Sequence, residues 1–308
     1  MNNYFYLQAV DTYAVIKLVN TNDNTPDIKF SRDGNVWYQW DYTNLTINAN
    51  TKIYFKGDNG INFSKYTGGI FRLSTFRIVS GGKVLAGGNI MSLLDDGACT
   101  RTEVGDFCFY NLFYNLGGLD IDVSFKLQAT KLGASCYYAM FYGTSLTKAP
   151  ALPATTLAIN CYREMFVGCN SLTTAPDLPA TTLTDYCCDS MFYNCTSLTK
   201  APALPATTLA INCYSSMFQG CTSLTKAPEI PAINLASSCC SYMFKDCTNL
   251  TTAPTILPAT TLEDSCYSNM FKGCTSLTKA PELPATTLKT DCYENMFNGC
   301  SKLNYIKA

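Results

Sequence analysis

The chain has 308 residues, a formal net charge of −1 and 15% charged residues, a balance that offers no basic face for a nucleic acid. It contains no histidine, which excludes histidine general bases, Cys–His and Ser–His dyads and every histidine-containing metal site. No apolar run approaches the roughly 20 residues that a membrane-spanning helix needs. We therefore expect a protein without a membrane span, without a cofactor and without catalytic activity.

Residues 1–98 are predicted to form a small antiparallel β-sandwich. Apolar and polar side chains alternate in short runs, and Asp33-Gly34 lies between two of them, which is a strong hairpin signal. We interpret Trp37, Trp40 and the many tyrosines as core and rim; an aromatic platform for a sugar is the alternative. The first residues lack a basic segment followed by an apolar one, so, if the chain truly starts here, we expect no export by the general route.

Residues 99–135 are predicted to be a transition that caps the next part of the chain. The stretch CFYNLFYNLGGL at residues 108–119 is a worn copy of a motif that recurs later, with Leu112-Phe113 where the later copies have Met-Phe. The first unit of a repeat array is usually atypical because one of its faces has no neighbouring repeat. We expect this segment to join the sandwich to the array.

Residues 136–308 repeat the motif C-Y-x-x-M-F-x-G-C-T-S-L-T-K-A-P-x-L-P-A-T-T-L about seven times. The Met-Phe pair sets the register and recurs after 25 to 27 residues, with its methionines at Met140, Met165, Met191, Met217, Met243, Met270 and Met296. A fixed period of this size is typical of a solenoid, in which each repeat contacts mainly its neighbours.

Each repeat is predicted to contain one short helix and one short strand. Cys, Met, Phe and a second Cys occupy positions i, i+4, i+5 and i+8, which we interpret as one helix face, with the preceding Thr-Thr pair as N-cap. The S-L-T-K-A segment is interpreted as a strand that A-P-x-L-P ends, because proline cannot donate to a ladder. The predicted fold is a β-rich N-terminal sandwich followed by an α/β leucine-rich-repeat solenoid with a parallel sheet.

Fourteen of the 17 cysteines occupy two positions of the motif, so the repeat explains them better than a secreted disulfide framework does. The C-x7-C spacing does not suit a zinc site, and positions eight residues apart on a helix lie too far apart for a disulfide. We interpret the cysteines as free, buried thiols that act as small apolar residues.

Charged residues at equivalent strand positions are the candidate ligand-binding residues. Lysine recurs at one position of the motif and acidic residues follow close behind: Lys148, Lys200, Lys226 and Lys279, with Asp177, Glu229 and Glu282. A solvated sheet face is one interpretation of this pattern. A binding face for a repetitive partner such as a glycan is the other. No residue is proposed as a catalytic, cofactor-binding or metal-binding group.

The MFxGCTSL and TKAPxLP motifs resemble those of BspA-like leucine-rich repeat proteins of gut Bacteroidales. The segment GNIMSLL at residues 88–94 also matches the end of a β-rich N-terminal region in one subgroup. The chain departs from the class in its longer repeat and its P-x-L-P step. The resemblance covers the whole chain and implies adhesion or recognition. Related repeats also occur in proteins of phages that infect these bacteria.

Two functional hypotheses follow from the resemblance and from the lack of a signal-peptide pattern. The first is a virion surface or fibre component of a phage infecting gut Bacteroidales, with the solenoid as binding module and the N-terminal domain contacting other virion proteins. The second is an adhesin on the bacterial cell surface whose signal peptide is absent from this chain. The expected partner is a glycan or protein on a bacterial or host surface, and self-association into a homo-oligomer is a further option.

Overall fold

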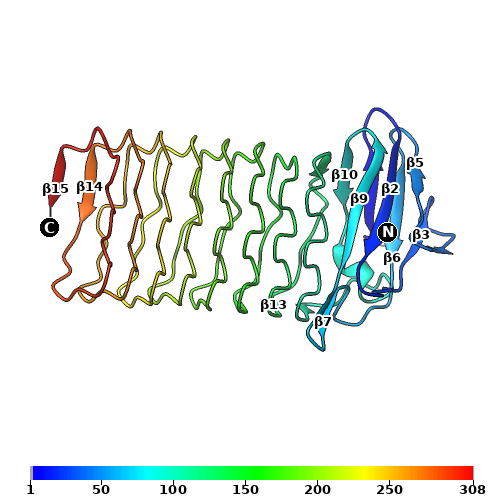
Figure 1. Ribbon diagram of the computed structural model, residues 1–308. Coiled ribbons are helices and arrows are strands. Elements are labelled where there is room, and N and C mark those ends of the chain that lie inside the picture. Colours follow the sequence, from blue (N-terminus) through cyan, green and yellow to red (C-terminus); the bar gives the residue numbers. More distant parts are fainter. Residues whose placement is uncertain (1–2, 308) are drawn as a thin grey trace.

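Two β-sheets form a domain at one end of the molecule, and a stack of coils extends from it (Figure 1). The computed structural model describes residues 3–307. The larger sheet has the strand order β12-β10-β1-β6-β3-β4 and the smaller one β5-β2-β9. Their strands are β1 (Phe5–Ala9), β2 (Ala14–Asn20), β3 (Lys29–Ser31), β4 (Tyr38–Gln39), β5 (Leu45–Ile47), β6 (Lys52–Lys56), β9 (Ser74–Gly81), β10 (Val84–Gly87) and β12 (Leu119–Ile121). β3 and β4 pair as the hairpin predicted around Asp33-Gly34.

The two sheets pack through aromatic side chains. Phe5 of β1 and Phe76 of β9 are fully buried with ring centroids 5.8 Å apart, and the Trp40 ring lies 5.6 Å from that of Phe55. Alternate residues at the start of β2 are buried, as expected for a strand with one face on a core. Trp40 therefore belongs to the core, whereas Trp37 is half-buried at its rim.

Short elements complete the described part of the chain. They are β7 (Lys65–Thr67), β8 (Ile70–Arg72), the 3-10 helix η1 (Ile90–Leu93), β11 (Glu103–Val104), β13 (Lys131–Leu132), β14 (Lys279–Glu282) and β15 (Tyr305–Lys307). β7 and β8 form a hairpin in which Gly68 and Gly69 both have positive φ, as a two-residue turn of this kind requires. Within residues 3–307, no helix is long and apolar enough to cross a membrane.

The segment between the two cysteines of each repeat is a run of tight turns. In one repeat, Asn212, Ser216 and Gly220 have φ values of 52°, 52° and 74°. The Ser215 N–H donates to the Asn212 carbonyl at 3.2 Å, whereas the Ser216 N–H donates to the Ser241 carbonyl of the next coil at 2.8 Å. Alternate N–H groups therefore turn the chain within a coil and join one coil to the next.

The predicted α/β solenoid is wrong. The residues from 3 to 307 contain no α-helix. The strand side of each coil, formed by its S-L-T-K-A segment and the residues that follow, meets the next coil mainly through isolated parallel bridges, such as Thr174–Lys200 and Lys226–Thr252. These described residues form no continuous parallel sheet. An α-helix turns by about 100° per residue, so positions i and i+8 would point about 80° apart. A four-residue turn unit brings both cysteines and the methionine to the same side. The Thr-Thr pairs consequently cap no helix.

The residue types at the positive-φ position of each turn unit explain why the repeat can adopt this turn conformation. It is filled mainly by Asn, Asp, Ser and Gly, which adopt the left-handed region more readily than branched residues do. The exceptions include Glu164, Tyr186 and Tyr242. The regular contacts between coils hold these residues in a conformation that they would rarely adopt alone.

Identical side chains from successive coils stack into columns inside the array. The rings of Phe192, Phe218 and Phe244 lie 5.6 Å apart with interplanar angles of 3° and 5°. The Cys221 thiol donates to the Phe192 carbonyl at 3.1 Å, and the equivalent thiols make the same bond elsewhere in the array. All 17 cysteines are free and all but Cys99 are buried, in agreement with the prediction from the motif.

The N-terminal domain covers the first coil by donating hydrogen bonds to its carbonyls. The hydrogen bonds between turn segments run in one direction, from the N–H of one coil to the carbonyl of the following coil, so the first coil presents acceptors without donors. The Ser64 N–H donates to the Cys108 carbonyl at 2.7 Å, and the Arg77 guanidinium donates to the Tyr114 carbonyl. The predicted division of the chain at residues 98 and 135 stays a prediction.

Candidate functional site

The strand side of the array presents lysines from equivalent positions of different coils. Lys148, Lys200, Lys226 and Lys279 are all exposed, and in each coil the leucine two positions earlier is buried. Each lysine is followed by an Ala-Pro pair, and the alanine before the proline is restricted to extended backbone. Lys200 and Lys226 accordingly lie at parallel bridges and Lys279 lies in β14, whereas Lys148 lies in a bend.

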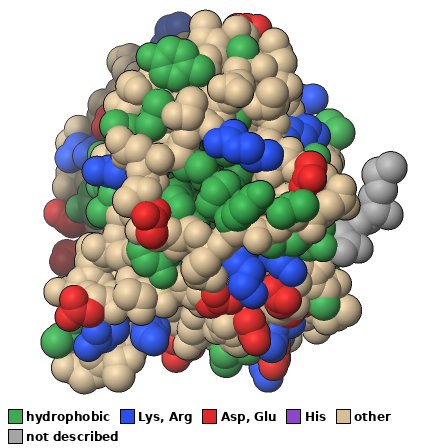
Figure 2. Space-filling model, turned by 90° about the vertical axis from the view of Figure 1, so that its right-hand side faces the viewer, with side chains coloured by type: hydrophobic (Ala, Val, Ile, Leu, Met, Phe, Trp, Pro, Cys, Tyr) green, Lys and Arg blue, Asp and Glu red, His purple; other side chains and the backbone are tan. Residues whose placement is uncertain are grey.

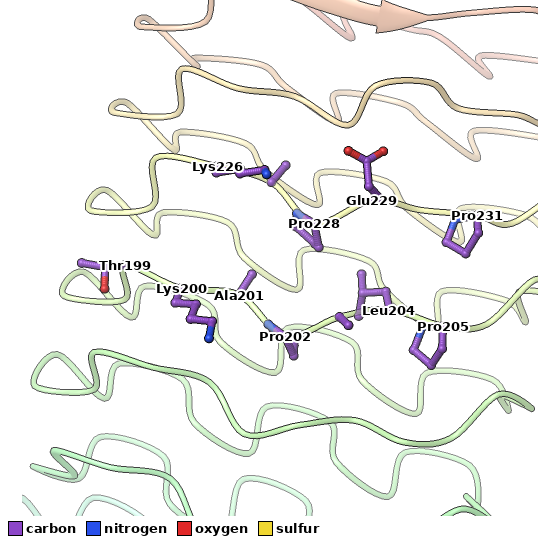
Figure 3. Close-up of a pocket in the computed structure, with 12 residues that line it drawn as sticks. Thr199, Lys200, Ala201, Pro202, Leu204, Pro205, Lys226, Pro228, Glu229 and Pro231 are labelled. Atoms are coloured by element: carbon purple, nitrogen blue, oxygen red, sulfur yellow. The ribbon is translucent and has the colours of Figure 1, made fainter.

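The lysines of two consecutive coils border a cavity where the backbone ladder is interrupted. The Thr199 N–H donates to the Thr173 carbonyl at 3.0 Å, and the Ala227 N–H donates to the Thr252 carbonyl at 2.9 Å. Among the described residues, no backbone hydrogen bond joins segment 199–205 to the equivalent segment 226–231. A cavity of about 490 Å³ opens between these two segments (Figure 3).

The cavity has a basic end and an apolar end. Figure 3 places Lys200 and Lys226 at one end and Pro205 and Pro231 at the other. Leu204, which is 3% exposed, contributes to the apolar lining. Neither lysine ammonium has an ion pair or a hydrogen bond with any residue in the described range. Two positive charges thus lie beside an apolar groove without a protein counter-ion.

Glu229 lines the same cavity but is engaged by the following coil. Its carboxylate accepts hydrogen bonds from the Thr255 N–H at 3.0 Å and from the Thr255 hydroxyl at 3.1 Å. Figure 3 accordingly shows the carboxylate on the side of its coil that is away from Lys200. Glu229 therefore joins two coils, and it forms no ion pair with Lys200 or Lys226.

The other predicted residues lie in separate places along the array. Lys148 borders a second cavity of about 650 Å³, between its own coil and the segment 119–126 that follows the worn repeat. The Lys279 ammonium lies 5.7 Å from the ring centroid of Tyr305. Asp177 is exposed, and Glu282 is bridged to Ile256 of the preceding coil. The structure therefore brings together Lys200, Lys226 and Glu229 and separates the rest; ligand binding by any of the seven residues stays a prediction.

Sequence reasoning missed the side chains that complete these cavities. The cavity beside Lys148 is also lined by Asp122, Val123 and Lys126. The Ser145 N–H donates to the Leu119 carbonyl at 3.1 Å, so residues 119–126 occupy the strand position of the worn repeat. An alignment that pairs Leu112-Phe113 of the worn repeat with Met140-Phe141 places Asp120, not Lys126, opposite Lys148, so the repeat pattern gave no signal for Lys126.

Burial favours the protonated thiol at most of the cysteines, whereas a hydrogen bond with the Cys188 side chain lowers the pKa of Cys187. Burial raises the pKa of the Cys108 and Cys247 thiols to about 12. A thiolate, not a thiol, is the nucleophile and the metal ligand. No cluster of three or more Cys, Asp or Glu residues from 3 to 307 could hold a metal ion.

One family model and one solved structure are similar to parts of the chain. The family described as BspA type leucine-rich repeat region matches residues 134–277 and 214–308, with six copies of its repeat. A crystal structure of a leucine-rich repeat protein from Bacteroides ovatus aligns with 58% of this chain at 17% identity and a TM-score of 0.36. The alignment spans 45% of that protein, so this chain matches less than half of its length. No curated protein sequence matches the chain.

Proposed function

The chain belongs to the BspA type leucine-rich repeat family, and we propose that it is a non-enzymatic recognition protein whose strand side binds an extended glycan. The observation that carries this proposal is the cavity between the coils of Lys200 and Lys226. It combines two unpaired ammonium groups with an apolar lining of proline and leucine side chains. An acidic glycan suits such a groove, because its charged groups would pair with the lysines and its apolar ring faces would cover the prolines.

The repeat geometry favours a ligand that is itself repetitive. Successive strand-like segments in a parallel array lie about 4.8 Å apart, so equivalent lysines are displayed at multiples of one spacing. Weak contacts to one lysine pair would be reinforced when a polymer reaches the cavity beside Lys148 as well, since the second contact is intramolecular. A polymer with regularly spaced charges is therefore a better partner than a compact molecule.

The binding proposal is tested by removing the two charges that the cavity presents. Each ion pair at an exposed site contributes up to about 1 kcal/mol, so Lys200→Gln combined with Lys226→Gln is expected to weaken binding about tenfold. Affinity electrophoresis in gels containing alginate, an acidic glycan, or dextran, a neutral one, measures this. The matched control is Lys17→Gln with Lys65→Gln, which removes two exposed lysines of the N-terminal domain.

The outcome separates binding from folding. All four lysines are exposed, so both double variants should unfold within about 1 °C of the parent protein. Loss of retardation by alginate in the Lys200 and Lys226 variant alone supports the proposal. Equal retardation of both variants, or retardation of the parent protein by dextran and not by alginate, contradicts it.

We further propose that the protein is displayed on the virion surface of a phage that infects gut Bacteroidales, with the bacterial cell surface as the alternative. The domain at one end of the array would anchor it while the coils project (Figure 1). Figure 2 shows that apolar side chains gather at the centre of the exposed end of this domain, with charged side chains around them. Such a patch suits contact with another protein.

Mass spectrometry of purified phage particles beside outer-membrane fractions of the host tests the location. Stoichiometric presence in particles supports the virion proposal. Presence only in the membrane fraction supports the cell-surface alternative and overturns the virion proposal.

A further inference from the structure

A third cavity with basic side chains lies where the N-terminal domain meets the first coil. Its volume is about 410 Å³, and it is lined from two segments that are far apart in the sequence: Arg77, Ile78, Gly81, Gly82 and Lys83 of the β9–β10 region, and Asn115, Leu116, Gly117 and Gly118 of the worn repeat. None of these nine residues is acidic. The cavity is thus separate from the strand-side groove.

The two basic side chains of this cavity have no protein counter-ion. The Arg77 guanidinium is half-buried and donates to the Tyr114 carbonyl. Within residues 3–307, no carboxylate forms an ion pair with Arg77 or Lys83. Burial lowers the pKa of the Arg77 guanidinium, a sign that its charge is incompletely solvated. A nearby anion would stabilise both charges.

The backbone of the worn repeat adds neutral donors to the same lining. The N–H groups of Gly117 and Gly118 have no acceptor among the described residues, whereas the Gly118 carbonyl accepts from the Val84 N–H at 2.9 Å. That bond ties the glycine pair to the first residue of β10, close to Lys83. Consecutive backbone N–H groups without acceptors are a common component of anion-binding sites.

The glycines also leave the cavity open. A Cβ at Gly117 would meet no atom nearer than 4.0 Å, so the space beside this residue is empty. A Cβ at Gly118 would already lie 3.1 Å from Ile78 Cδ1. A side chain at Gly118 would therefore narrow the cavity.

We propose that this junction binds one oxyanion, a carboxylate or a sulfate group, between Arg77, Lys83 and the Gly117-Gly118 backbone. A guanidinium matches the geometry of such groups, because its N–H donors lie in one plane and can pair with two oxygens. Arg77 uses one N–H group on Tyr114, and its remaining donors are available to the ligand. The ligand would bridge the N-terminal domain and the first coil. This inference does not rest on the proposed glycan binding of the strand side.

The test is an NMR titration of the full chain that follows the amide signals of Gly117 and Gly118. Sodium sulfate is compared with sodium chloride at equal ionic strength, and sodium glucuronate with glucose. We expect saturable shifts with at least one of the two oxyanions and none with chloride or glucose. Lys83→Gln should weaken binding roughly fivefold, the upper value for an exposed ion pair. Gly118→Val should abolish it, because the added side chain would point at Ile78, Gly82 and Lys83 of the lining.

Lys65→Gln is the matched control, because it removes an exposed lysine on β7 outside the cavity. Saturation by sulfate and glucuronate alike indicates a general oxyanion site, and saturation by glucuronate alone indicates a sugar carboxylate. The proposal is overturned by the absence of saturation with both anions. It is equally overturned if Gly118→Val keeps its fold, judged by its dispersed amide spectrum, and binds as tightly as the parent protein.

Discussion

The phenylalanine column offers the sharpest test of how the array is held together. Phe218 is fully buried, and its ring lies 5.6 Å from those of Phe192 and Phe244, nearly parallel to both. Truncation of a buried phenylalanine to alanine costs about 3–5 kcal/mol, and two stacked neighbours place Phe218→Ala in the upper part of that range. Phe297 is only half-buried and stacks on Phe271 alone, at 5.8 Å. Phe297→Ala should therefore cost about 1–2 kcal/mol.

Equilibrium unfolding in urea measures both variants. Far-ultraviolet circular dichroism follows the whole chain, and the fluorescence of Trp37 and Trp40 follows the N-terminal domain alone, so coincident transitions would show that the two parts unfold together. In a stack of repeats, stability is close to a sum of contributions from each repeat and from its contacts with neighbours. Equal losses for Phe218→Ala and Phe297→Ala, or a loss below about 1 kcal/mol for Phe218→Ala, would refute this reasoning.

Three further predictions concern the backbone and the thiols. Gly220→Ala should destabilise the protein by about 1–2 kcal/mol, because Gly220 has a φ of 74° and the added Cβ would overlap the Asn194 side chain. The control is Gly60→Ala: Gly60 has a φ of 61° and open space around it, so this substitution measures the backbone contribution alone. The pKa of the Cys247 thiol is raised from 9.0 to about 12 in the folded protein, so the unfolded chain loses this proton at lower pH. The free energy of unfolding should therefore be highest below pH 9 and fall as the pH rises toward 12. Unfolding followed by circular dichroism from about pH 7 to 12 checks this, and a free energy of unfolding that does not change with pH contradicts it. Native protein should react very little with a thiol reagent at neutral pH, whereas unfolded protein should show close to 17 free thiols. A count near zero after unfolding would exclude the interpretation of the cysteines as free thiols.

The sequence by itself determined the parts of the structure that depend on register. Because the same residues return after 25 to 27 positions, the leucine, phenylalanine, methionine and cysteine of each copy had to meet their counterparts in neighbouring copies. The buried cysteines, the exposed lysines and the worn first repeat all follow from that register. Leu112 and Phe113 of the worn repeat are indeed fully buried, and Phe113 stacks on Phe141 at 5.5 Å.

The local backbone of the repeat was not determined by the pattern of buried residues. Positions i, i+4, i+5 and i+8 suit a short helix, and they also suit four-residue turn units over so short a segment. The structure favours the turns because alternate N–H groups can then bind the next coil, as the Phe218 N–H binds the Met243 carbonyl at 2.9 Å. An α-helix would use those donors within itself. Only the neighbouring coil makes the turn backbone the better solution.

The candidate sites depended most strongly on tertiary structure. The motif placed Lys200 and Lys226 on consecutive coils, but the cavity between them exists because no backbone hydrogen bond closes the two coils at that point. The anion site requires Arg77 and Gly117, which are 40 positions apart in the sequence and meet only because the N-terminal domain packs on the first coil. A repeat pattern reports which residues recur, whereas the spaces between coils and domains are set by how completely their backbones pair.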